Sequence, residues 1–362
     1  MTPSTEAGAL VVRAIHASDL DALIELARQV GSGMTTLKPD RKMLGDRVAI
    51  AVASFAGAIP PEQRDYMFVM EDTGSGRLAG VCAIKGAVGL DEPFYNYRIG
   101  TLVHSSRELD VFTRMETLYL SNDLTGATEL CSLFLHPDYR SGNNGKWLSK
   151  SRFLFIAQFP HLFTEKLIAE MRCYQTQDGS SPFYEGLGRH FFKMDFNHVD
   201  HLTAMGKKSF IAELMPRQPM YVAYLPEAAQ EVIGKVHVST APARRLLEQE
   251  GMHFEGYVDI FDAGPVLQAR VSELRAMRDS VVATLDGPAA AADGAGSDAA
   301  AALAEPVLVS NTRIDDFRMI VAHANPASGK LALSDAEMAL LHCQRGDPVR
   351  TLSLNVRKNS HV

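Results

Sequence analysis

The chain of 362 residues is 46% hydrophobic, which is enough apolar material for one large or two ordinary domains with a sizeable core. Its 36 Lys and Arg residues against 43 Asp and Glu residues give a net charge of −7, without a block of like charges. These values exclude a disordered or fibrous protein and argue against nucleic acid or a membrane surface as a partner.

The cysteines of the chain indicate a reducing compartment. Cys82, Cys131, Cys173 and Cys343 are widely spaced and form no CxxC pair and no His/Cys cluster, so we expect buried thiols and no metal site. The sequence also shows no signal-like amino terminus and no apolar run of the ~20 residues that a membrane helix requires. We therefore expect a cytoplasmic protein.

Strand-like and helix-like segments alternate through the first half of the chain. Apolar alternation predicts strands at 10–15, 66–71, 78–84, 129–136 and 167–172. Helical periodicity predicts helices at 18–29, 40–58, about 145–159 and 181–192. The Gly-rich DTGSGR between the second and third strands indicates a hairpin, and Pro160 ends the third helix. This order is typical of an α/β fold with a mixed sheet flanked by helices.

The second half of the chain is less regular and changes composition once. We expect helices at 228–235 and 241–250 and a strand at 253–262. The segment 285–305 is rich in Ala and Gly and reads as a linker or loop. Short strand signals such as PVLVS and RTLSLNV follow it. The predicted division is therefore an α/β domain over 1–284, the linker, and a small β-rich domain over 306–362.

A loop of small residues joins the strand ending at His136 to the helix that follows. Its small residues are Gly142, Asn143, Asn144 and Gly145. Such a turn exposes backbone N–H groups at the positive end of the helix dipole, where a phosphate can bind, and Arg140 adds charge. The loop matches neither the P-loop pattern nor G-x-G-x-x-G. A tight connection that merely requires positive φ is the alternative.

This strand, loop and helix resemble the acyl-CoA signature of the GNAT superfamily of N-acyltransferases. There a strand leads into Arg/Gln-x-x-Gly-x-Gly/Ala and a helix whose amino end holds the CoA pyrophosphate. Here the stretch Arg140-Ser-Gly-Asn-Asn-Gly145 has Asn143 at the first Gly position, with a Gly one residue earlier. Asn tolerates the left-handed region better than most residues. The resemblance implies that residues 140 and 142–145 bind an acyl-CoA.

Longer stretches are similar to the arginine N-succinyltransferase family, from about Val11 to the carboxyl end. They include PFYNYRIGTLVHSSRELDVF, LYLSNDLTGATELCSLFLHPDYR, SPFYEGLGRHFFKMDF and VIGKVHVSTAPARRLLEQEGM. The resemblance implies transfer of succinyl from succinyl-CoA, a co-substrate rather than a resident cofactor, to the α-amine of L-arginine, the first step of arginine degradation to glutamate. It also implies a GNAT-like α/β domain with a small C-terminal β-barrel-like unit, in a homo-oligomer or a hetero-oligomer with a related chain.

Acyl transfer to an amine needs a neutral amine, stabilisation of the oxyanion and a proton for the departing thiolate. No Cys/His nucleophile pattern is present, so direct transfer is expected. The family's proton-donor His falls on His237, in VIGKVHVSTAPARR, and imidazole with its unperturbed pKa of ~6.5 suits the role. His136 ranks second. Either histidine could instead cap or pack a helix.

Further contacts follow from the family and from the charges of the substrates. The resemblance places Leu133 at a succinyl-CoA contact, made through the backbone of a strand that a bulge splays from its neighbour. Candidate partners of the guanidinium group are Asp123, Glu129 and Glu170. Candidate partners of the succinyl carboxylate are Arg98 and Arg172. Each of these charged residues could equally form an ordinary surface pair.

Two alternatives to the main interpretation remain open at the level of sequence. The acceptor could be ornithine or another amine, because some related enzymes contain two similar chains and accept more than one amino acid. The chain could also be a non-catalytic acyl-CoA-binding subunit. Retention of His237 and of the intact segment 118–140 argues against the second alternative.

Overall fold

The computed structural model describes residues 9–30, 34–176, 179–286, 305–324, 326 and 328–356. The strands of its first half are β1 (Leu10–Ala14), β2 (Asp65–Asp72), β3 (Arg77–Lys85), β4 (Asn96–Ser106), β5 (Val111–Ser121), β6 (Thr128–Leu135), β7 (Lys166–Glu170) and β8 (Met220–Tyr221). The later strands are β9 (His253–Asp259), β10 (Pro265–Arg270), β11 (Val281–Asp286), β12 (Pro306–Asn311), β13 (Arg318–His323), β14 (Lys330–Ala332) and β15 (Pro348–Ser353).

The α-helices are α1 (Leu20–Arg28), α2 (Arg41–Phe55), α3 (Asn144–Gln158), α4 (Arg189–Phe192), α5 (Phe196–Ala204), α6 (Ser209–Leu214), α7 (Glu227–Gln230), α8 (Ala241–Gln249), α9 (Arg275–Asp279) and α11 (Asp335–Leu340). None of these helices is long and apolar enough to cross a bilayer, within the ranges described.

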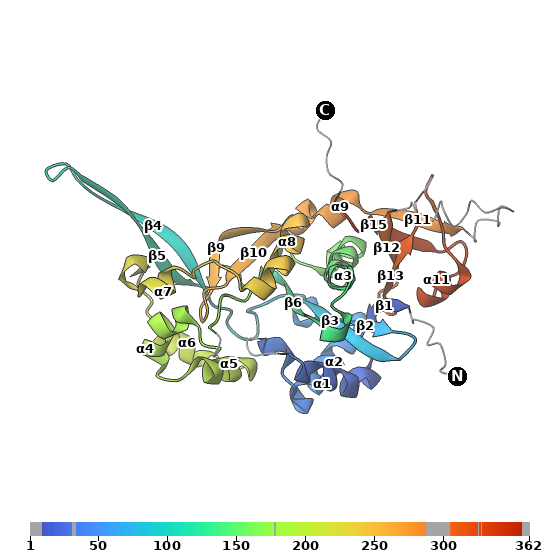
Figure 1. Cartoon of the computed structure of the whole chain (residues 1–362), viewed down its shortest axis with the longest axis horizontal. Coiled ribbons are helices and arrows are strands. Elements are labelled where there is room, and N and C mark those ends of the chain that lie inside the picture. Colours follow the sequence, from blue (N-terminus) through green and yellow to red (C-terminus); the bar gives the residue numbers. More distant parts are fainter. Residues whose placement is uncertain are drawn as a thin grey trace.

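One continuous mixed sheet runs through the described part of the molecule (Figure 1). Its strands follow the order β14-β11-β15-β12-β13-β1-β2-β3-β6-β7-β10-β9-β4-β5-β8. The neighbours β6 and β7 are parallel, as are β11 and β14, whereas the other paired strands are antiparallel. The predicted mixed α/β sheet with flanking helices is confirmed.

Helices cover both faces of the sheet around β2 and β3 (Figure 1). On one face Phe68 of β2 packs against Phe155 of α3, with ring centroids 5.0 Å apart. On the other face Met67 lies in a core cluster with Leu23 of α1 and Leu44 of α2. Burial on both faces explains why β2 is a nearly unbroken apolar run rather than an alternating strand.

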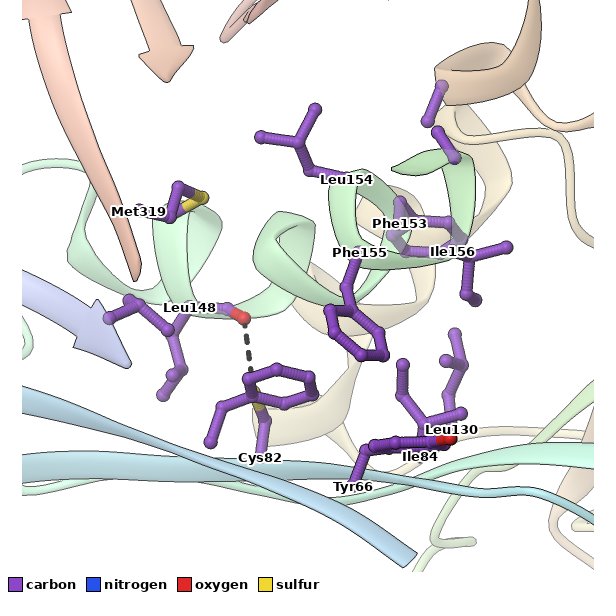
Figure 2. Packing of buried hydrophobic residues seen from close by; sticks show 14 of the residues in the cluster. Tyr66, Cys82, Ile84, Leu130, Leu148, Phe153, Leu154, Phe155, Ile156 and Met319 are labelled. Carbon is purple, nitrogen blue, oxygen red and sulfur yellow. Dashed lines mark hydrogen bonds between the residues drawn. The ribbon is translucent and has the colours of Figure 1, made fainter. Parts of the chain in front are cut away.

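Helix α3 is central to the larger core. Figure 2 shows Phe155 and Ile156 of α3 directed toward Tyr66 and Ile84 of the sheet. The Sγ of Cys82 donates a hydrogen bond of 3.4 Å to the carbonyl oxygen of Leu148. Because α3 is buried almost all round, from residue 148 to 157, its position relative to the sheet is fixed by packing.

Several elements differ from the sequence prediction. The structure contains β4, β5, β10, α5 and α6, which were not predicted. The predicted helix at 228–235 is helical only over Glu227–Gln230, and the one at 181–192 contains a π-helical turn over Tyr184–Gly188. The outer parts of β4 and β5 form a ribbon without a buried face, so no strict apolar alternation marks them in the sequence.

The C-terminal strands extend the main sheet, because β13 pairs with β1. Strand β11 pairs with β14 and β15, so this strand, which precedes the Ala/Gly-rich segment, belongs with the C-terminal sheet. The boundary predicted after residue 284 falls inside β11, and the division into domains stays a prediction. Most of the predicted linker, 287–304, lies outside the described residues, as do residues 357–362.

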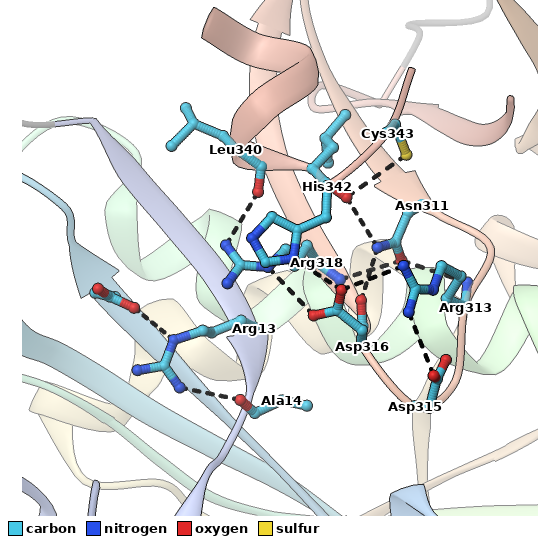
Figure 3. Close-up of polar contacts among 12 residues, drawn as sticks. Arg13, Ala14, Asn311, Arg313, Asp315, Asp316, Arg318, Leu340, His342 and Cys343 are labelled. Carbon is cyan, nitrogen blue, oxygen red and sulfur yellow. Dashed lines mark hydrogen bonds and ion pairs between the residues drawn. The ribbon is translucent and has the colours of Figure 1, made fainter. Parts of the chain in front are cut away.

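Polar contacts hold the turn after α11 against β12 and β13 (Figure 3). The Nδ2 of Asn311 donates to the carbonyl oxygens of Asp316 and Leu341, at 2.7 and 3.0 Å. His342 Nδ1 lies 2.8 Å from Asp316 Oδ2, and Arg318 donates to the carbonyl oxygen of Leu340 at 3.1 Å. These bonds satisfy buried carbonyl groups at the end of α11.

A buried ion network joins the two halves of the chain behind α3. Lys150 of α3 donates to Glu250, and Arg275 of α9 donates to the same carboxylate at 3.0 and 3.1 Å. Arg275 also donates to the carbonyl oxygen of Ser353 in β15, at 3.2 Å. The side chains of Lys150 and Glu250 are fully buried, so each charge depends on the other for compensation.

Replacement of Glu250 by Gln should lower the free energy of unfolding by about 3 kcal/mol, because two buried cations lose their only shared carboxylate. Urea denaturation measures the change. The matched control is Glu248→Gln, which removes the exposed partner of Arg244 and should cost at most about 0.5 kcal/mol. Equal losses in the two variants would show that the network contributes no more than a surface pair.

Candidate active site

The site begins where the parallel strands β6 and β7 separate. They pair only at Thr128 with Leu167 and at Glu129 with Ile168. Beyond this point β6 stays with β3 up to Leu135, whereas β7 follows β10 to Glu170. From Leu130 onward, this side of β6 therefore has no neighbouring strand among the described residues, and its backbone is available to another molecule.

A bulge in β6 accompanies the separation. Ser132 has a φ of +55°, and the pairing register with β3 shifts opposite it, between Val81 and Ala83. The bulge is held from α2, because Arg47 donates to Ser132 Oγ at 2.7 Å and to Asp65 at 2.6 Å. These contacts stabilise a backbone conformation that a non-glycine residue rarely adopts.

A cavity of about 460 Å³ occupies the gap between β6 and β7. It is lined along β6 by residues 129–134, along β7 and the segment after it by 169–172, and across the opening by Ser239, Thr240, Ala243 and Leu247. Leu133 lines this cavity directly after the bulge and also packs against the large core.

The predicted phosphate loop leads from this cavity to α3. Arg140 lines the cavity, donates through Nε to the carbonyl oxygen of Leu135 at 2.9 Å and lies over the ring of Phe134 at 5.5 Å. Asn143 is the N-cap residue of α3 but its side chain accepts no capping hydrogen bond. Asn144 Nδ2 donates to the carbonyl oxygen of Tyr139 at 3.0 Å.

The N-terminus of α3 is the positive end of the helix dipole and favours an anion. The first turn of α3 contains no acidic side chain that would already supply this negative charge. Gly142 has a φ of +57°, so the loop needs a residue that tolerates the left-handed region there. Gly145 does not have a positive φ. An added Cβ there would meet only Leu135 Cδ2, at 3.8 Å, so a larger residue fits. The two glycines therefore have different roles.

Gly142→Ala should lower the free energy of unfolding by about 1 kcal/mol, because an L-residue is strained in the left-handed region. Gly145→Ala should leave it unchanged or raise it by up to about 1 kcal/mol, because Ala favours the helix. Thermal unfolding of both variants tests the difference. An unchanged Gly142→Ala protein would mean that the loop relaxes freely.

His237 does not itself line the same cavity but comes two residues before Ser239, which does. Its backbone N–H donates to the carbonyl oxygen of Arg172 at 3.0 Å. Its Nδ1 accepts from the backbone N–H of Ser239 at 3.2 Å and lies 2.6 Å from Ser239 Oγ. Because Nδ1 is an acceptor, neutral His237 carries its proton on Nε2. Nε2 is therefore the ring nitrogen that remains to exchange a proton with a substrate.

A second cavity of about 380 Å³ adjoins the first. The carboxylates of Glu129, Glu170 and Asp259 line both cavities and so mark their junction. The second cavity is also lined by Glu62, Asp91, Glu92, Lys85 and Lys208. Acidic side chains outnumber basic ones there, which favours a cationic occupant.

The junction carboxylates have perturbed acidities. Burial, followed by the nearby charges of Asp259 and Glu129, raises the pKa of Glu170 well above its usual range. Burial also raises the pKa of Glu129 and of Asp259. Burial together with Asp259 raises the pKa of Asp262 to about 8. Asp259 and Asp262 were not predicted, and the only sequence signal was their place at the end of the 253–262 strand.

The other predicted residues lie as follows. Arg172 lines the first cavity and donates to Gln175, and burial lowers the pKa of its guanidinium group. Asp123 accepts from Tyr257 at 2.8 Å and lies 3.9 Å from Arg98, so these two predicted residues form an exposed group outside the lining of either cavity. Their roles, like those of the other site residues, stay predictions.

Two residues near the loop have structural contacts. His136 accepts through Nδ1 from the backbone N–H of Asp138 at 3.2 Å and lines neither cavity. Trp147 packs against the large core. Among the described residues, no group of three or more His, Cys, Asp or Glu side chains is arranged to hold a metal ion.

Comparison with known proteins identifies the family. The model of the arginine N-succinyltransferase beta subunit matches residues 10–276. The chain belongs to the arginine N-succinyltransferase family. A second model of this family, for the C-terminal domain of the beta subunit, matches residues 294–353. The resemblance expected from the sequence is therefore confirmed, and the chain is a member of a family of acyltransferases.

Relatives match over nearly their whole length. The arginine N-succinyltransferase subunit beta of Pseudomonas aeruginosa is 48% identical over 349 residues, covering 96% of this chain and 99% of the relative. The arginine N-succinyltransferase of Enterobacter sp. (strain 638) is 46% identical, covering 95% and 98%. The structure of arginine/ornithine succinyltransferase subunit AI from P. aeruginosa superimposes with a TM-score of 0.85 at 34% identity, covering 96% of this chain and all of that one.

Proposed function

We propose that the protein transfers the succinyl group of succinyl-CoA to the α-amine of L-arginine, which begins the degradation of arginine to glutamate. The observation that carries the proposal is the junction of two cavities. One cavity lies in the gap between β6 and β7, and the other is lined by more acidic than basic side chains. A donor and a cationic acceptor can therefore meet at one point in the chain's own fold.

The donor side suits an acyl-CoA. The free side of β6 around Leu133 offers backbone N–H and C=O groups to the pantetheine arm, as an added strand would use them. At the far end, the N-terminus of α3 and Arg140 favour the pyrophosphate. Residues 142–145 form the turn that brings these N–H groups to the surface.

The acceptor side suits arginine. A guanidinium group is a permanent cation that binds carboxylates, and the second cavity offers six of them. Lys208 and Lys85 supply positive charge in the same cavity for the α-carboxylate of an amino acid. The α-amine then lies toward the junction, where Glu129 and Glu170 separate the two cavities.

The reaction proceeds by direct attack of the neutral α-amine on the thioester carbonyl carbon. The N–C bond forms, the C–S bond breaks, and the thiolate takes the Nε2 proton of the imidazolium form of His237, which the proton lost by the attacking nitrogen then restores. Nδ1 of His237 lies 2.6 Å from Ser239 Oγ, to which the imidazolium can donate, so Ser239 holds the ring while Nε2 exchanges the proton. A backbone N–H of β6 near Leu133 can polarise the thioester carbonyl.

Thiol release from succinyl-CoA with arginine, measured at neutral pH, should be lowered about 10²- to 10⁴-fold by His237→Ala, because the leaving thiolate loses its proton donor. The matched control is His136→Ala, whose ring accepts from the backbone N–H of Asp138 and whose loss should change the rate less than threefold. Acetyl-CoA as donor and ornithine and lysine as acceptors complete the comparison.

Each result has a distinct meaning. A faster reaction with ornithine would assign the enzyme to the alternative acceptor, in keeping with the arginine/ornithine name of the solved relative. No thiol release with any pair of substrates would contradict the proposal and favour a non-catalytic acyl-CoA-binding subunit.

We also propose that the reaction takes place in the cytoplasm. The four cysteines are free, and Cys82, Cys131 and Cys173 are buried. Burial raises the pKa of the Cys131 thiol to about 11, so it is protonated and inert at neutral pH. Free cysteines of this kind are typical of proteins in a reducing compartment.

Self-association is a further part of the proposal, through the outer β4–β5 ribbon (residues 99–116). This ribbon extends away from the rest of the molecule (Figure 1). Strand β9 pairs with β4 only at 96–98 and β8 pairs with β5 only at 117 and 118. A two-stranded ribbon is marginally stable alone, yet this one exposes Leu109 and Phe112 by 75% and 70%. A second copy of the chain would cover these side chains.

The double variant Leu109→Ser/Phe112→Ser should therefore reduce the mass measured by light scattering to the 39.6 kDa of one chain. The control is Ile50→Ser on α2, which is 42% exposed and should leave the assembly intact. A wild-type protein that is already monomeric, or that assembles only with a related chain, would contradict self-association through the ribbon.

A further inference from the structure

We propose that Glu170 is the base that takes the proton from the α-ammonium group of the acceptor, and that Asn96 is its positioning residue. This inference rests on the proposed function. At neutral pH the α-amine of an amino acid is mostly an ammonium ion, which has no lone pair for attack. Some group at the junction of the two cavities must therefore accept a proton.

Glu170 lies where this proton would be transferred. It is the last residue of β7 and lines both cavities. The neighbouring residues 169 and 171 also line the cavity in the β6–β7 gap, in which the thioester would lie. An amine that enters from the acidic cavity to reach the thioester must therefore pass this carboxyl group.

Asn96 holds the carboxyl group from the adjacent strands. Asn96 of β4 is the register partner of Asp259 in β9, so their side chains share one face of the sheet. The Nδ2 of Asn96 donates to Glu170 Oε1 at 2.9 Å. Asn96 is only 1% exposed, yet its Oδ1 has no hydrogen-bond partner in the described chain. A buried acceptor of this kind points to a donor from a bound molecule.

The other carboxylates of the junction already have partners. Asp259 accepts the backbone N–H groups of Phe261 and Asp262, at 2.7 and 2.8 Å. The charges of Lys85 and Arg47 favour the ionised form of Glu129. Glu170 has only the neutral amide of Asn96, and no Lys or Arg forms an ion pair with it among the described residues.

Because of the charges around Glu170, a bound cation would change the ionisation of its carboxyl group. The nearby titratable groups are Glu129 of β6, Asp259 of β9, Asp262 after β9, Lys85 of β3, Arg172 after β7 and Lys208 of the second cavity. The carboxylates among them raise the pKa of Glu170, as does burial. A bound ammonium ion would favour its ionised form and then give it a proton.

The protons balance as follows. The α-ammonium group gives one proton to a Glu170 oxygen and becomes a neutral amine, which attacks the thioester carbon. The sulfur leaves with the Nε2 proton of His237, and the nitrogen's second proton restores His237. Glu170 ends the cycle in the protonation state in which it began, so that one proton is released to water in each turnover.

The test is the pH dependence of kcat/KM for arginine in Glu170→Gln. At neutral pH we expect a loss of about 10²- to 10⁴-fold. The rate of the variant should then rise about tenfold per pH unit toward the pKa of the free amine, because only the neutral amine reacts. The wild-type enzyme should instead reach a plateau above the pKa of Glu170. An unchanged shape of the profile, or a rise in KM alone, would overturn the proposal.

Asn96→Ala provides a second test, which holds even if Glu170→Gln does not fold. Loss of the donated hydrogen bond disfavours the ionised carboxylate, so the acid limb of the profile should move to higher pH. The control is Asn122→Ala, whose Nδ2 donates to the carbonyl oxygen of Phe94 outside the junction, and whose profile should match the wild type. No shift in Asn96→Ala would contradict the positioning role.

Calorimetry gives a readout that does not depend on turnover. Arginine binding in buffers of different ionisation enthalpy should release more protons from the wild-type enzyme than from Glu170→Gln, because a bound cation favours the ionised form of the Glu170 carboxyl group. If the wild-type enzyme transferred no acyl group, the proposed function would be wrong. If the wild-type enzyme transferred the acyl group, but Glu170→Gln released as many protons on binding and had the same pH profile, only the proposed role of Glu170 would be wrong.

Discussion

The separation of β6 from β7 is the constraint on which the site depends. Two parallel neighbours in a sheet normally share a ladder along their length, whereas these share only two pairs of residues. The left-handed Ser132 turns β6 away, and Arg47 holds it there through a buried pair with Asp65. Backbone polar groups that are left without a ladder must find another partner, so the same feature that interrupts the sheet makes it a binding surface.

The distribution of buried charge follows from this opening. Behind α3, the cations Lys150 and Arg275, which line neither of the two cavities, share the carboxylate of Glu250. At the junction of the cavities Glu170 lacks such compensation, and its pKa is raised. A fold tolerates an uncompensated buried charge poorly. Its presence beside a cavity is therefore consistent with a substrate that supplies the missing cation.

Local sequence patterns predicted the helices, strands and turns whose residues follow the pattern that is usual for that type of element. The loop from Arg140 to Gly145 was found because turn residues and a helix start follow a strand directly, and the structure begins α3 at Asn144. The β4–β5 ribbon was missed because its outer residues have no buried face and hence no apolar alternation. The shortened helix at Glu227–Gln230 shows that helical periodicity alone does not exclude a turn.

The sequence by itself determined the mixed α/β class, the loop and the family, because these depend on residues that are adjacent or regularly spaced along the chain. It also indicated Glu129 and Glu170 as acidic candidates. Only the tertiary structure decided which carboxylates meet, because Asp259 reaches the junction through the pairing of β9 with β4 and β10. The same pairing brings Asn96 to Glu170, 74 residues apart in sequence. Contacts between strands so far apart depend on sheet order, which no local pattern encodes.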